Sequence, residues 1–342
     1  MAIGYQAMTT NTAGGTTNIA IGNYSLDALT SGDGNVGVGM ETLSATNTGR
    51  YNTAVGYRTL YTNTEGDTNV AVGKESLYYN TTGDDNIALG NQALTTNTTG
   101  ASNIAVGTNA LTANTTADDN IAIGHNTLSA NTTGTRNIGI GRGAYYGSDT
   151  ENDNLAIGYN AMTTNTAGGS TNIAIGNYAM DGLTSGDSNV SIGHYAGGAL
   201  TTGADNTFLG YYAGSLTTTA SDNTGIGYQA LYNNTGPQNV SVGHNSSFNN
   251  TSGAHNTAVG YLALHTSTTG NNHTAFGQEA LHKVTTGANN QGIGRDAGSE
   301  ITTGSNNVCL GTAAGDGITT GSTNVCVGYG AGAVTTGSNQ LY

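Results

Sequence analysis

An aliphatic residue, a small residue, a second aliphatic residue and a glycine recur together at regular intervals along the whole chain. Aligning on that glycine gives 20 units, and sixteen of them share a length of seventeen. The units at 1–18 and 155–172 are one residue longer, and those at 224–239 and 325–340 are one residue shorter. The consensus is h-A-h-G-x-x-A-L-x-x-N-T-T-G-x-x-N, where h is mostly aliphatic, and we number its positions one to seventeen. A repeat this regular predicts one array of similar structural units over residues 1–342.

The first four positions of each unit predict a short β-strand. β-Branched residues alternate there with alanine and are followed by glycine, a mixture that helices avoid and that short strands favour. We expect a weaker second strand over positions seven to twelve and a turn over the rest of the unit. Each unit is then one coil of a parallel β-solenoid, so the sequence predicts an all-β fold of about 20 coils of about 17 residues.

The side chains of the predicted strand divide between two faces. Neighbouring residues of a strand point in opposite directions, so positions one and three share a face and position two takes the other. Positions one and three are mainly Ile, Val and Leu, and we expect them to form the core. Position two is Ala in 11 units, Gly in 4, Ser in 2, Cys in 2 and Phe in one. Small residues facing outward favour close packing against another copy of the chain; the alternative is that alanine merely fits a narrow coil.

Two columns of identical residues predict how the coils stack. Position four is glycine in all 20 units, which indicates a bend that needs a positive φ or leaves no room for a Cβ. This column includes Gly22, Gly56, Gly90, Gly124 and Gly158. Position seventeen is asparagine in 18 units, and a stacked asparagine can donate to and accept from its copies in neighbouring coils. The predicted amide ladder includes Asn69, Asn103, Asn120 and Asn137.

The composition fits a repeat array and narrows the class of partner. The chain holds 55 glycines, one proline and no tryptophan, and only 8% of its residues are charged. With 21 acidic and 7 basic residues, the net charge of −14 argues against binding to nucleic acid or to an anionic membrane. No apolar run approaches the ~20 residues of a membrane-spanning helix, and the N-terminal sequence lacks the features of a signal peptide. We therefore expect neither nucleic acid as a partner nor membrane insertion.

The tandem motif N-(I/V)-A-(I/V)-G-x-x-(A/S) resembles the head repeats of trimeric autotransporter adhesins, the YadA-like head. The segments NIAIGHNTL and NVAVGKESL carry the resemblance, which covers essentially the whole chain. It implies a left-handed parallel β-roll that forms homotrimers and binds host surfaces. The segments NTAVGYRTL and NTAVGYLAL are also similar to the shafts of phage tail fibres. Because both ends of the sequence fall inside the repeat, we expect flanking fibre segments as further partners.

Tyrosines are the strongest candidates for contact with a receptor. The chain has 19 of them, and three adjacent pairs stand out because one member of a pair in a strand must point outward. Exposed aromatic side chains are rare without a purpose, and their rings can stack on sugars. Packing against a neighbouring subunit is an equal alternative. The pairs are Tyr78 with Tyr79, Tyr145 with Tyr146, and Tyr211 with Tyr212.

No pattern of residues indicates an enzyme, a cofactor or a metal centre. The seven histidines show no metal-ligand spacing and are best explained as surface polar residues, with His273 a tolerated replacement of a ladder asparagine. Acidic turns could hold calcium, but they lack the pattern of calcium-binding β-rolls, so solvated turns are favoured. The best exception to that view comprises Asp149, Glu151 and Asp153.

Two smaller features complete the sequence evidence. Cys309 and Cys326 occupy position two of successive units, where parallel side chains disfavour a disulfide and favour small buried thiols. Threonine runs such as T-T-N-T-T suggest an ice-binding β-solenoid, although their place beside glycine and asparagine argues against a flat array.

The sequence as a whole predicts a non-enzymatic, homotrimeric fibre or adhesin shaft. Its expected location is extracellular, on a virion tail fibre or a bacterial cell surface. Its expected partners are two further copies of itself and a cell-surface glycan or protein receptor, with weak contacts summed over three chains. The alternatives are an ice-binding solenoid and a purely structural extracellular filament.

Overall fold

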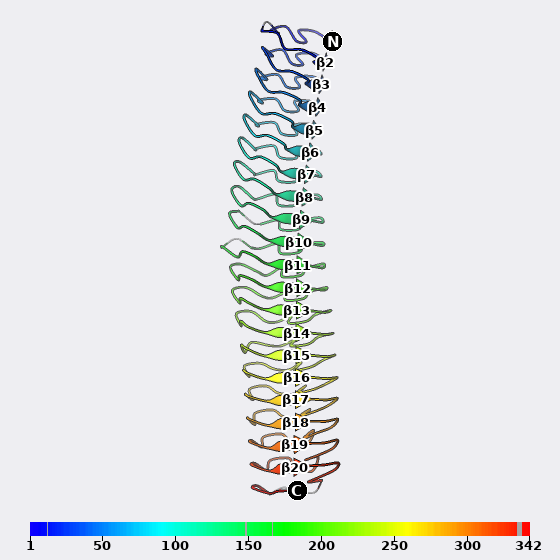
Figure 1. Cartoon of the computed structure of the whole chain (residues 1–342), viewed down its shortest axis with the longest axis vertical. Coiled ribbons are helices and arrows are strands. Elements are labelled where there is room, and N and C mark those ends of the chain that lie inside the picture. Colours follow the sequence, from blue (N-terminus) through cyan, green and yellow to red (C-terminus); the bar gives the residue numbers. More distant parts are fainter. Residues whose placement is uncertain (12, 148, 166, 334–336) are drawn as a thin grey trace. The chain divides into compact units, whose positions relative to one another are not determined.

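A computed structural model describes residues 1–11, 13–147, 149–165, 167–333 and 337–342. The chain divides into two compact units, Met1–Thr171 and Asn172–Tyr342. Each unit contains ten strands, and the described residues form no helix (Figure 1). The all-β prediction is confirmed, whereas a single domain over residues 1–342 stays a prediction.

Each repeat of the sequence supplies one strand. The strands of the first unit are β1 (Ala2–Ile3), β2 (Ile19–Ile21), β3 (Val36–Val38), β4 (Thr53–Val55), β5 (Val70–Val72), β6 (Ile87–Leu89), β7 (Ile104–Val106), β8 (Ile121–Ile123), β9 (Ile138–Ile140) and β10 (Leu155–Ile157). Those of the second unit are β11 (Ile173–Ile175), β12 (Val190–Ile192), β13 (Thr207–Leu209), β14 (Thr224–Ile226), β15 (Val240–Val242), β16 (Thr257–Val259), β17 (Thr274–Phe276), β18 (Gln291–Ile293), β19 (Val308–Leu310) and β20 (Val325–Val327).

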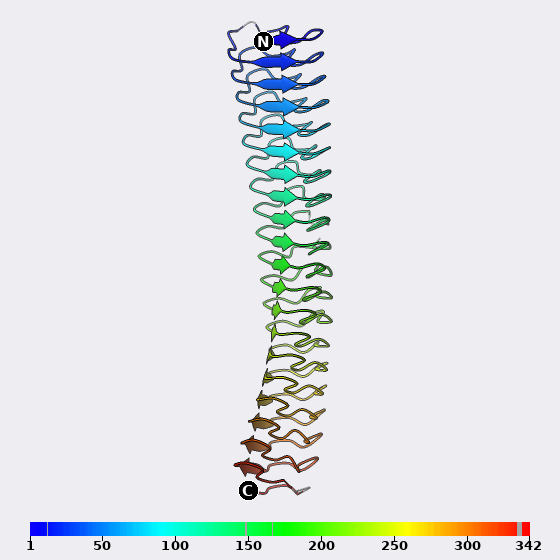
Figure 2. The ribbon, with the colours of Figure 1, turned by 90° about the vertical axis from the view of Figure 1, so that its right-hand side faces the viewer.

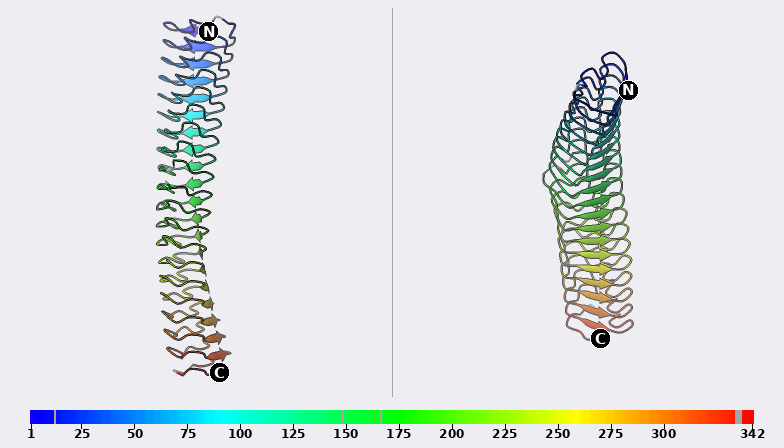
Figure 3. Two further views of the ribbon diagram at one scale, coloured as in Figure 1. Left: turned by 90° about the vertical axis from the view of Figure 1, so that its left-hand side faces the viewer. Right: turned by 45° about the horizontal axis from the view of Figure 1, so that its top comes forward.

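Successive strands within a unit pair in parallel and in register. Ala122 of β8 pairs with Ala105 of β7 and with Gly139 of β9, so each position of the repeat lies beside its copies in the neighbouring coils. The arrows of each unit stack along one side, with the turns on the other sides (Figures 2 and 3). The predicted parallel β-solenoid, with one strand and one turn of the chain per sequence repeat, is therefore confirmed in each unit.

The two faces of the strands are the reverse of the sequence prediction. Position two points inward, since Ala54, Ala122 and Phe208 are fully buried. Positions one and three point outward, and Val72 and Ile123 each remain 39% exposed. The expectation that positions one and three form the core is thus wrong, and so is the inference that position two meets another chain. Alanine fills position two because the coil is narrow and its interior is shared with position eight.

The interior of each coil combines position two with positions seven and eight. Ala110 and Leu111 occupy positions seven and eight of the β7 coil, and both are fully buried beside the strand residue Ala105. A small residue at position two leaves the space that leucine fills at position eight. Burial of a leucine side chain contributes about 1.5–3 kcal/mol, so position eight supplies most of the apolar core.

The predicted second strand is not present in the described coils, where positions five to ten form turns. Positions six, eight and sixteen adopt left-handed backbone conformations, as at Asn126 (φ 54°), Leu128 (φ 50°) and Arg136 (φ 57°). Such a conformation costs roughly 1–2 kcal/mol at a residue with a Cβ. Bonds between coils offset that cost: the Leu128 N–H, for example, donates to the Ala144 carbonyl at 3.1 Å.

The glycine column has both of the predicted causes. Gly124 has a φ of 140°, and a Cβ there would lie 2.5 Å from the carbonyl oxygen of Gly141 in the next coil. A Cβ at Gly22, Gly56 or Gly90 would likewise lie between 2.2 and 2.5 Å from the next glycine carbonyl. Gly158 shares the positive φ, at 138°. Position four must therefore be glycine for two coils to approach each other.

The predicted asparagine ladder is confirmed. In addition to the side-chain amides, backbone N–H groups of ladder asparagines donate to the side-chain oxygen of the asparagine in the preceding coil. The backbone N–H of Asn137 donates to Oδ1 of Asn120 at 2.9 Å, and that of Asn120 donates to Oδ1 of Asn103 at 3.0 Å. The amide nitrogen of each reaches the following coil, as when Asn120 Nδ2 donates to the Gly134 carbonyl at 2.8 Å. Asn69 makes the same pair of bonds, to Asn52 and Gly83. These side chains are buried, so the ladder satisfies polar groups that would otherwise destabilise the interior.

Candidate functional site

The outward residues of the strands form an apolar stripe in each unit. We define the apolar stripe as positions one and three of β2 to β10 in the first unit and of β11 to β20 in the second. None of these positions carries a charged residue. Large side chains are exposed on it, including Phe276 (56%) and Val327 (54%). Extended apolar surface of this kind makes the stripe a candidate interaction site, and the stripe lies on the face that was expected to form the core.

The six tyrosines of the three adjacent pairs were expected to contact a receptor, and the structure contradicts this expectation at one of them. Tyr79, Tyr146 and Tyr211 are 50%, 49% and 46% exposed, so one member of each pair does point outward. Tyr145, in contrast, is fully buried at position eight. Its expected contact with a receptor is therefore wrong.

Tyr145 has a structural explanation. Its hydroxyl lies 2.5 Å from Nδ2 of Asn154 and 3.1 Å from Nδ2 of Asn165. Both amides donate to that oxygen, so the tyrosine enters the asparagine network at the place that leucine holds in other coils. The pair Tyr145–Tyr146 thus divides its roles, with only the second residue accessible to a ligand.

A groove follows positions six and nine across several coils of the first unit. We call it the amide groove and define it by side-chain amides on one wall and hydroxyls on the other. Three hollows of about 350, 350 and 380 Å³ adjoin along it, and neighbouring hollows share lining residues. The amide wall consists of Gln92, Asn109, Asn126 and Asn160; the hydroxyl wall consists of Thr95, Thr112, Ser129, Tyr146 and Thr163.

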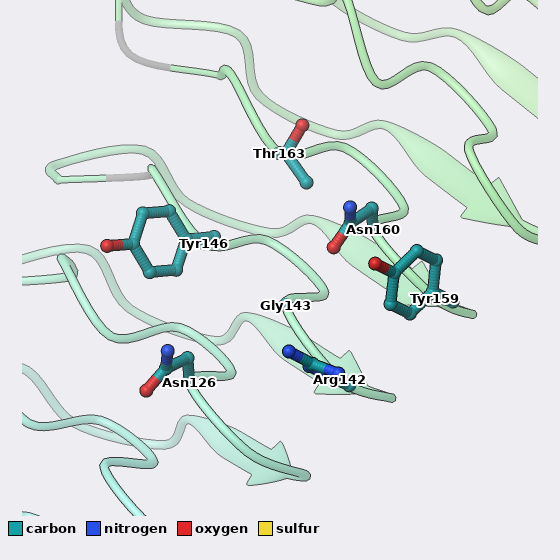
Figure 4. Close-up of a pocket in the computed structure, with 7 residues that line it drawn as sticks. All are labelled: Asn126, Arg142, Gly143, Tyr146, Tyr159, Asn160 and Thr163. Atoms are coloured by element: carbon teal, nitrogen blue, oxygen red, sulfur yellow. The ribbon is translucent and has the colours of Figure 1, made fainter.

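The widest hollow of the amide groove lies where position six is a glycine. A Cβ at Gly143 would lie 2.4 Å from Oδ1 of Asn160, so a side chain there would have to displace that amide. The missing side chain opens the space between Asn126 and Asn160. In Figure 4, Tyr146 and Tyr159 stand on opposite sides of this space. At about 380 Å³ the hollow has the size of a small-ligand pocket, typically about 300–1,000 Å³.

Aromatic side chains of the second unit form stacks instead of isolated platforms. Tyr212 stacks on Tyr195 with ring centroids 5.2 Å apart. Tyr211 lies between His194 at 5.3 Å and Tyr228 at 5.4 Å, with interplanar angles of 25° and 4°. Neighbouring rings cover both faces of Tyr211, so a sugar would meet its edge. Of the candidate tyrosines, Tyr146 in the amide groove is thus better placed to receive a sugar face.

The acidic side chains singled out as a calcium candidate serve separate purposes. Glu151 is buried, and its carboxylate accepts from the backbone N–H groups of Asp149, Thr150 and Gly168 at 3.0–3.1 Å. The carboxylate of Asp153 pairs with Arg136, which lowers the pKa of Asp153 through their hydrogen bond. Across the described ranges, no three His, Cys, Asp or Glu side chains are grouped so that they could hold a metal ion.

His273 takes over the role of a ladder asparagine. Its backbone N–H donates to Oδ1 of Asn256 at 2.9 Å, and its Nδ1 accepts from the Asn290 N–H at 3.3 Å. Only a neutral ring with a free Nδ1 lone pair can accept that bond. Burial lowers the pKa of His273 to about 4. The view of His273 as a replacement for the asparagine fits these contacts, although the residue is buried and not on the surface.

The two cysteines lie in register in the core. Cys309 pairs with Cys326 across β19 and β20, and both are buried free thiols, as expected. Burial raises the pKa of Cys309 to about 12. A thiol with so high a pKa is a poor nucleophile, because the thiolate is the reactive form.

A second amide ladder, at position eleven, was not predicted from the sequence. Nδ2 of Asn97 donates to Oδ1 of Asn80 at 2.9 Å and to the Gly100 carbonyl at 2.8 Å. Asn114 repeats both bonds, to Asn97 and Ala117. The consensus asparagine at position eleven carried the signal, but its position in an expected second strand concealed its role.

Comparison with known proteins adds no family to this geometry. No protein-family model and no curated protein sequence matches the chain. In the part of the chain that the structure describes, no helix has the length and apolar character needed to cross a membrane.

Proposed function

We propose that the chain is the shaft of a non-enzymatic homotrimeric fibre that attaches a virion or a bacterial cell to a surface. The apolar stripe is the observation that carries this proposal. Exposing a solenoid face made of uncharged, mainly aliphatic side chains to water is unfavourable, so we expect this face to be buried against a partner.

A second and third copy of the same chain are the cover that fits best. The stripe repeats once per coil, at the ~4.8 Å spacing of neighbouring β-strands. Only a partner with the same axial repeat keeps its side chains in step with the stripe over many coils, and an identical chain has that repeat. Each chain has a net charge of −14, so chains repel one another where charged side chains meet. The stripe holds no charged residue, so association through it brings no charged side chains into the contact.

Attachment would take place through residues away from the stripe. The amide groove and the exposed tyrosines belong to other positions of the repeat, so a trimer presents three copies of each. Three weak sites on one shaft act together, since the second and third contacts are intramolecular once the first has formed. The resemblance to adhesin heads and tail-fibre shafts gives this arrangement its biological setting, outside the cell.

The alternative of an ice-binding solenoid is less favoured by the threonine contacts. The hydroxyls of Thr81 and Thr98 donate to the position-twelve carbonyls of the next coils, both at 2.9 Å. Hydroxyls engaged with the backbone are not free to form a regular array toward ice. Measurable thermal hysteresis would nevertheless favour ice binding over attachment. A purely structural filament remains the second alternative, and a ligand for the amide groove would distinguish it from an adhesin.

The mass of the protein in solution tests the assembly. Sedimentation equilibrium should give three times the chain mass of 34.3 kDa. A monomer of 34.3 kDa at micromolar concentration would contradict the trimer, and a stable dimer would require a different cover for the stripe.

A further inference from the structure

Arg142 is an unusual cation in an acidic chain. The protein has only 7 basic residues against 21 acidic ones. Five of the seven form ion pairs with carboxylates. The pKa of Asp33 is lowered mainly by hydrogen bonds from Thr16 and, to a smaller extent, by the charge of the sixth, Arg50. Among the residues described, Arg142 has no ion-pair partner, and no carboxylate lines the hollow in which it lies. Its guanidinium is therefore available to an anion from solution.

The charges along the groove change in one direction. Toward the N-terminal coils the groove continues past Gln92 to Glu75. The ion pair of Arg58 with Glu41 follows. A further hollow, lined by Asp27, lies beyond that ion pair. The middle of the groove is neutral, lined by amides and hydroxyls. Arg142 supplies positive charge at the other end. A ligand that follows the groove should accordingly be neutral along its length and negative at one end.

The walls of the groove fit the chemistry of a sugar chain. The side-chain amides of Asn126 and Asn160 supply donors and acceptors that match hydroxyl groups. Tyr146 and Tyr159 are 49% and 39% exposed and present rings at the two sides of the hollow (Figure 4), where the apolar C–H face of a pyranose can pack. The amides of Gln92, Asn109 and Asn126 lie in three successive coils, ~4.8 Å apart, and can each contact one unit of an extended polymer.

We propose that the amide groove binds an oligosaccharide whose terminal sugar carries a carboxylate, with that carboxylate on Arg142 and the neutral sugars along Asn126, Asn109 and Gln92. The planar guanidinium can hold a carboxylate through two parallel hydrogen bonds. A polymer with a carboxylate on every sugar is disfavoured, because the Glu75 carboxylate lines the groove and would repel it. The proposal deepens the proposed function and rests on it for its biological meaning.

A trimer formed through the apolar stripe would not use the residues that line the groove. None of the residues that line the groove occupies position one or three, so the apolar stripe and the groove are separate surfaces of the repeat. Binding is consequently testable on the full chain in whatever oligomeric state it adopts.

The test is direct binding of two matched sugars to the full-length protein. Sialyllactose is lactose extended by one terminal sugar that carries a carboxylate, and lactose lacks that terminal sugar. Titration calorimetry or saturation-transfer NMR should detect millimolar binding of sialyllactose and at least tenfold weaker binding of lactose. Arg142→Ala should lose at least tenfold in sialyllactose affinity, and Tyr146→Ala severalfold.

Arg136→Ala is the matched control. It removes the same charge from an exposed arginine in the preceding coil, where Arg136 pairs with Asp153 outside the groove. An unchanged affinity is expected, and circular dichroism verifies that all variants fold. Equal binding of both sugars, an equal loss in Arg136→Ala, or no binding at millimolar concentration would each overturn the proposal. If the protein is a trimer that binds neither sugar, the proposed fibre stands and the sugar site is wrong. If it is a monomer that binds sialyllactose through Arg142, the sugar site stands and the proposed trimer is wrong.

Discussion

A single glycine per coil determines how closely two coils can approach. At Gly124 the positive φ and the carbonyl of Gly141 act together, since a Cβ would be strained by the first and would collide with the second. Gly328 separates the two effects. It has a φ of 119°, but no atom lies within 4 Å of the place its Cβ would occupy.

Replacement of these two glycines should therefore have unequal effects. Gly124→Ala should lower the local free energy of unfolding by about 4 kcal/mol, from strain and overpacking combined. Gly328→Ala should cost only about 1–3 kcal/mol, from the dihedral alone. Amide hydrogen exchange near each site measures the difference. Equal losses would show that the conformation, and not the contact, requires glycine.

The residue His273 makes stability depend on pH. Its pKa is lowered to about 4 in the folded chain, below the value of about 6.5 in an unfolded one. Protonation therefore favours the unfolded chain, and stability is lost as the pH falls from about 6.5 to about 4. The physical cause is the buried ring, whose Nδ1 must stay unprotonated to accept from Asn290.

His273→Asn should remove this dependence. Between pH 7 and pH 5 the wild type should lose about 2 kcal/mol more stability than the variant. Urea unfolding followed by circular dichroism at several pH values provides the measurement. His255→Asn, which replaces an exposed histidine, serves as a control and should behave as the wild type does. Parallel profiles for wild type and His273→Asn would contradict the assigned role.

At the scale of the element, positions two and eight share one interior space. Eight of the 20 coils combine alanine at position two with leucine at position eight, as in Ala122 and Leu128. The β13 coil combines Phe208 with Gly214, and a Cβ on that glycine would lie 2.4 Å from the phenyl ring. The β19 coil follows the same rule, since a Cβ on Gly315 would lie 2.2 Å from Sγ of Cys309. In the β13 and β19 coils, a larger residue at position two thus fills the space that leucine at position eight fills elsewhere.

A double substitution in the β13 coil tests this exchange. Phe208→Ala should cost about 3–5 kcal/mol by leaving a cavity, and Gly214→Leu alone should destabilise the coil by collision with the ring. The double variant should recover most of the loss, because Gly214 has a φ of 57° and leucines at position eight adopt similar values, such as 50° at Leu128. Thermal unfolding of the four proteins gives the coupling energy. Additive losses would rule out a shared space.

At the scale of the whole molecule, the direction in which each strand residue points decides what the protein can assemble with. The apolar stripe is present in both units, and the small residues of position two are buried in both. Lysine at the outward Ile123 should leave the coil folded and dissociate the proposed trimer. Lysine at the buried Ala122 should unfold the coil, since an unpaired charge would enter the core.

Sedimentation and circular dichroism together measure these two outcomes. The expected result is a folded monomer for Ile123→Lys and a loss of β-structure for Ala122→Lys. A folded Ala122→Lys together with an unfolded Ile123→Lys would restore the opposite orientation of the strand. If Ile123→Lys gives a folded trimer instead, the stripe is not the interface.

Much of the architecture could be predicted from the sequence because the repeat constrains it. The invariant glycine of position four and the asparagine of position seventeen each have one physical role in stacked coils, and both roles are confirmed at Gly124 and Asn120. The amide groove could not be predicted, because its walls come from positions six and nine of several coils. Those positions vary in the sequence and become neighbours only when the coils stack.

The sequence by itself determined that the chain is a parallel solenoid with one coil per repeat, since periodicity requires no knowledge of how a coil is closed. Which face of each strand points inward was decided only by the tertiary structure. Alternation at positions one to three separates two faces without saying which is inside. The left-handed residues at positions six and eight close the coil so tightly that Ala122 and Leu128 fill the interior, and Ile121 and Ile123 are left outside.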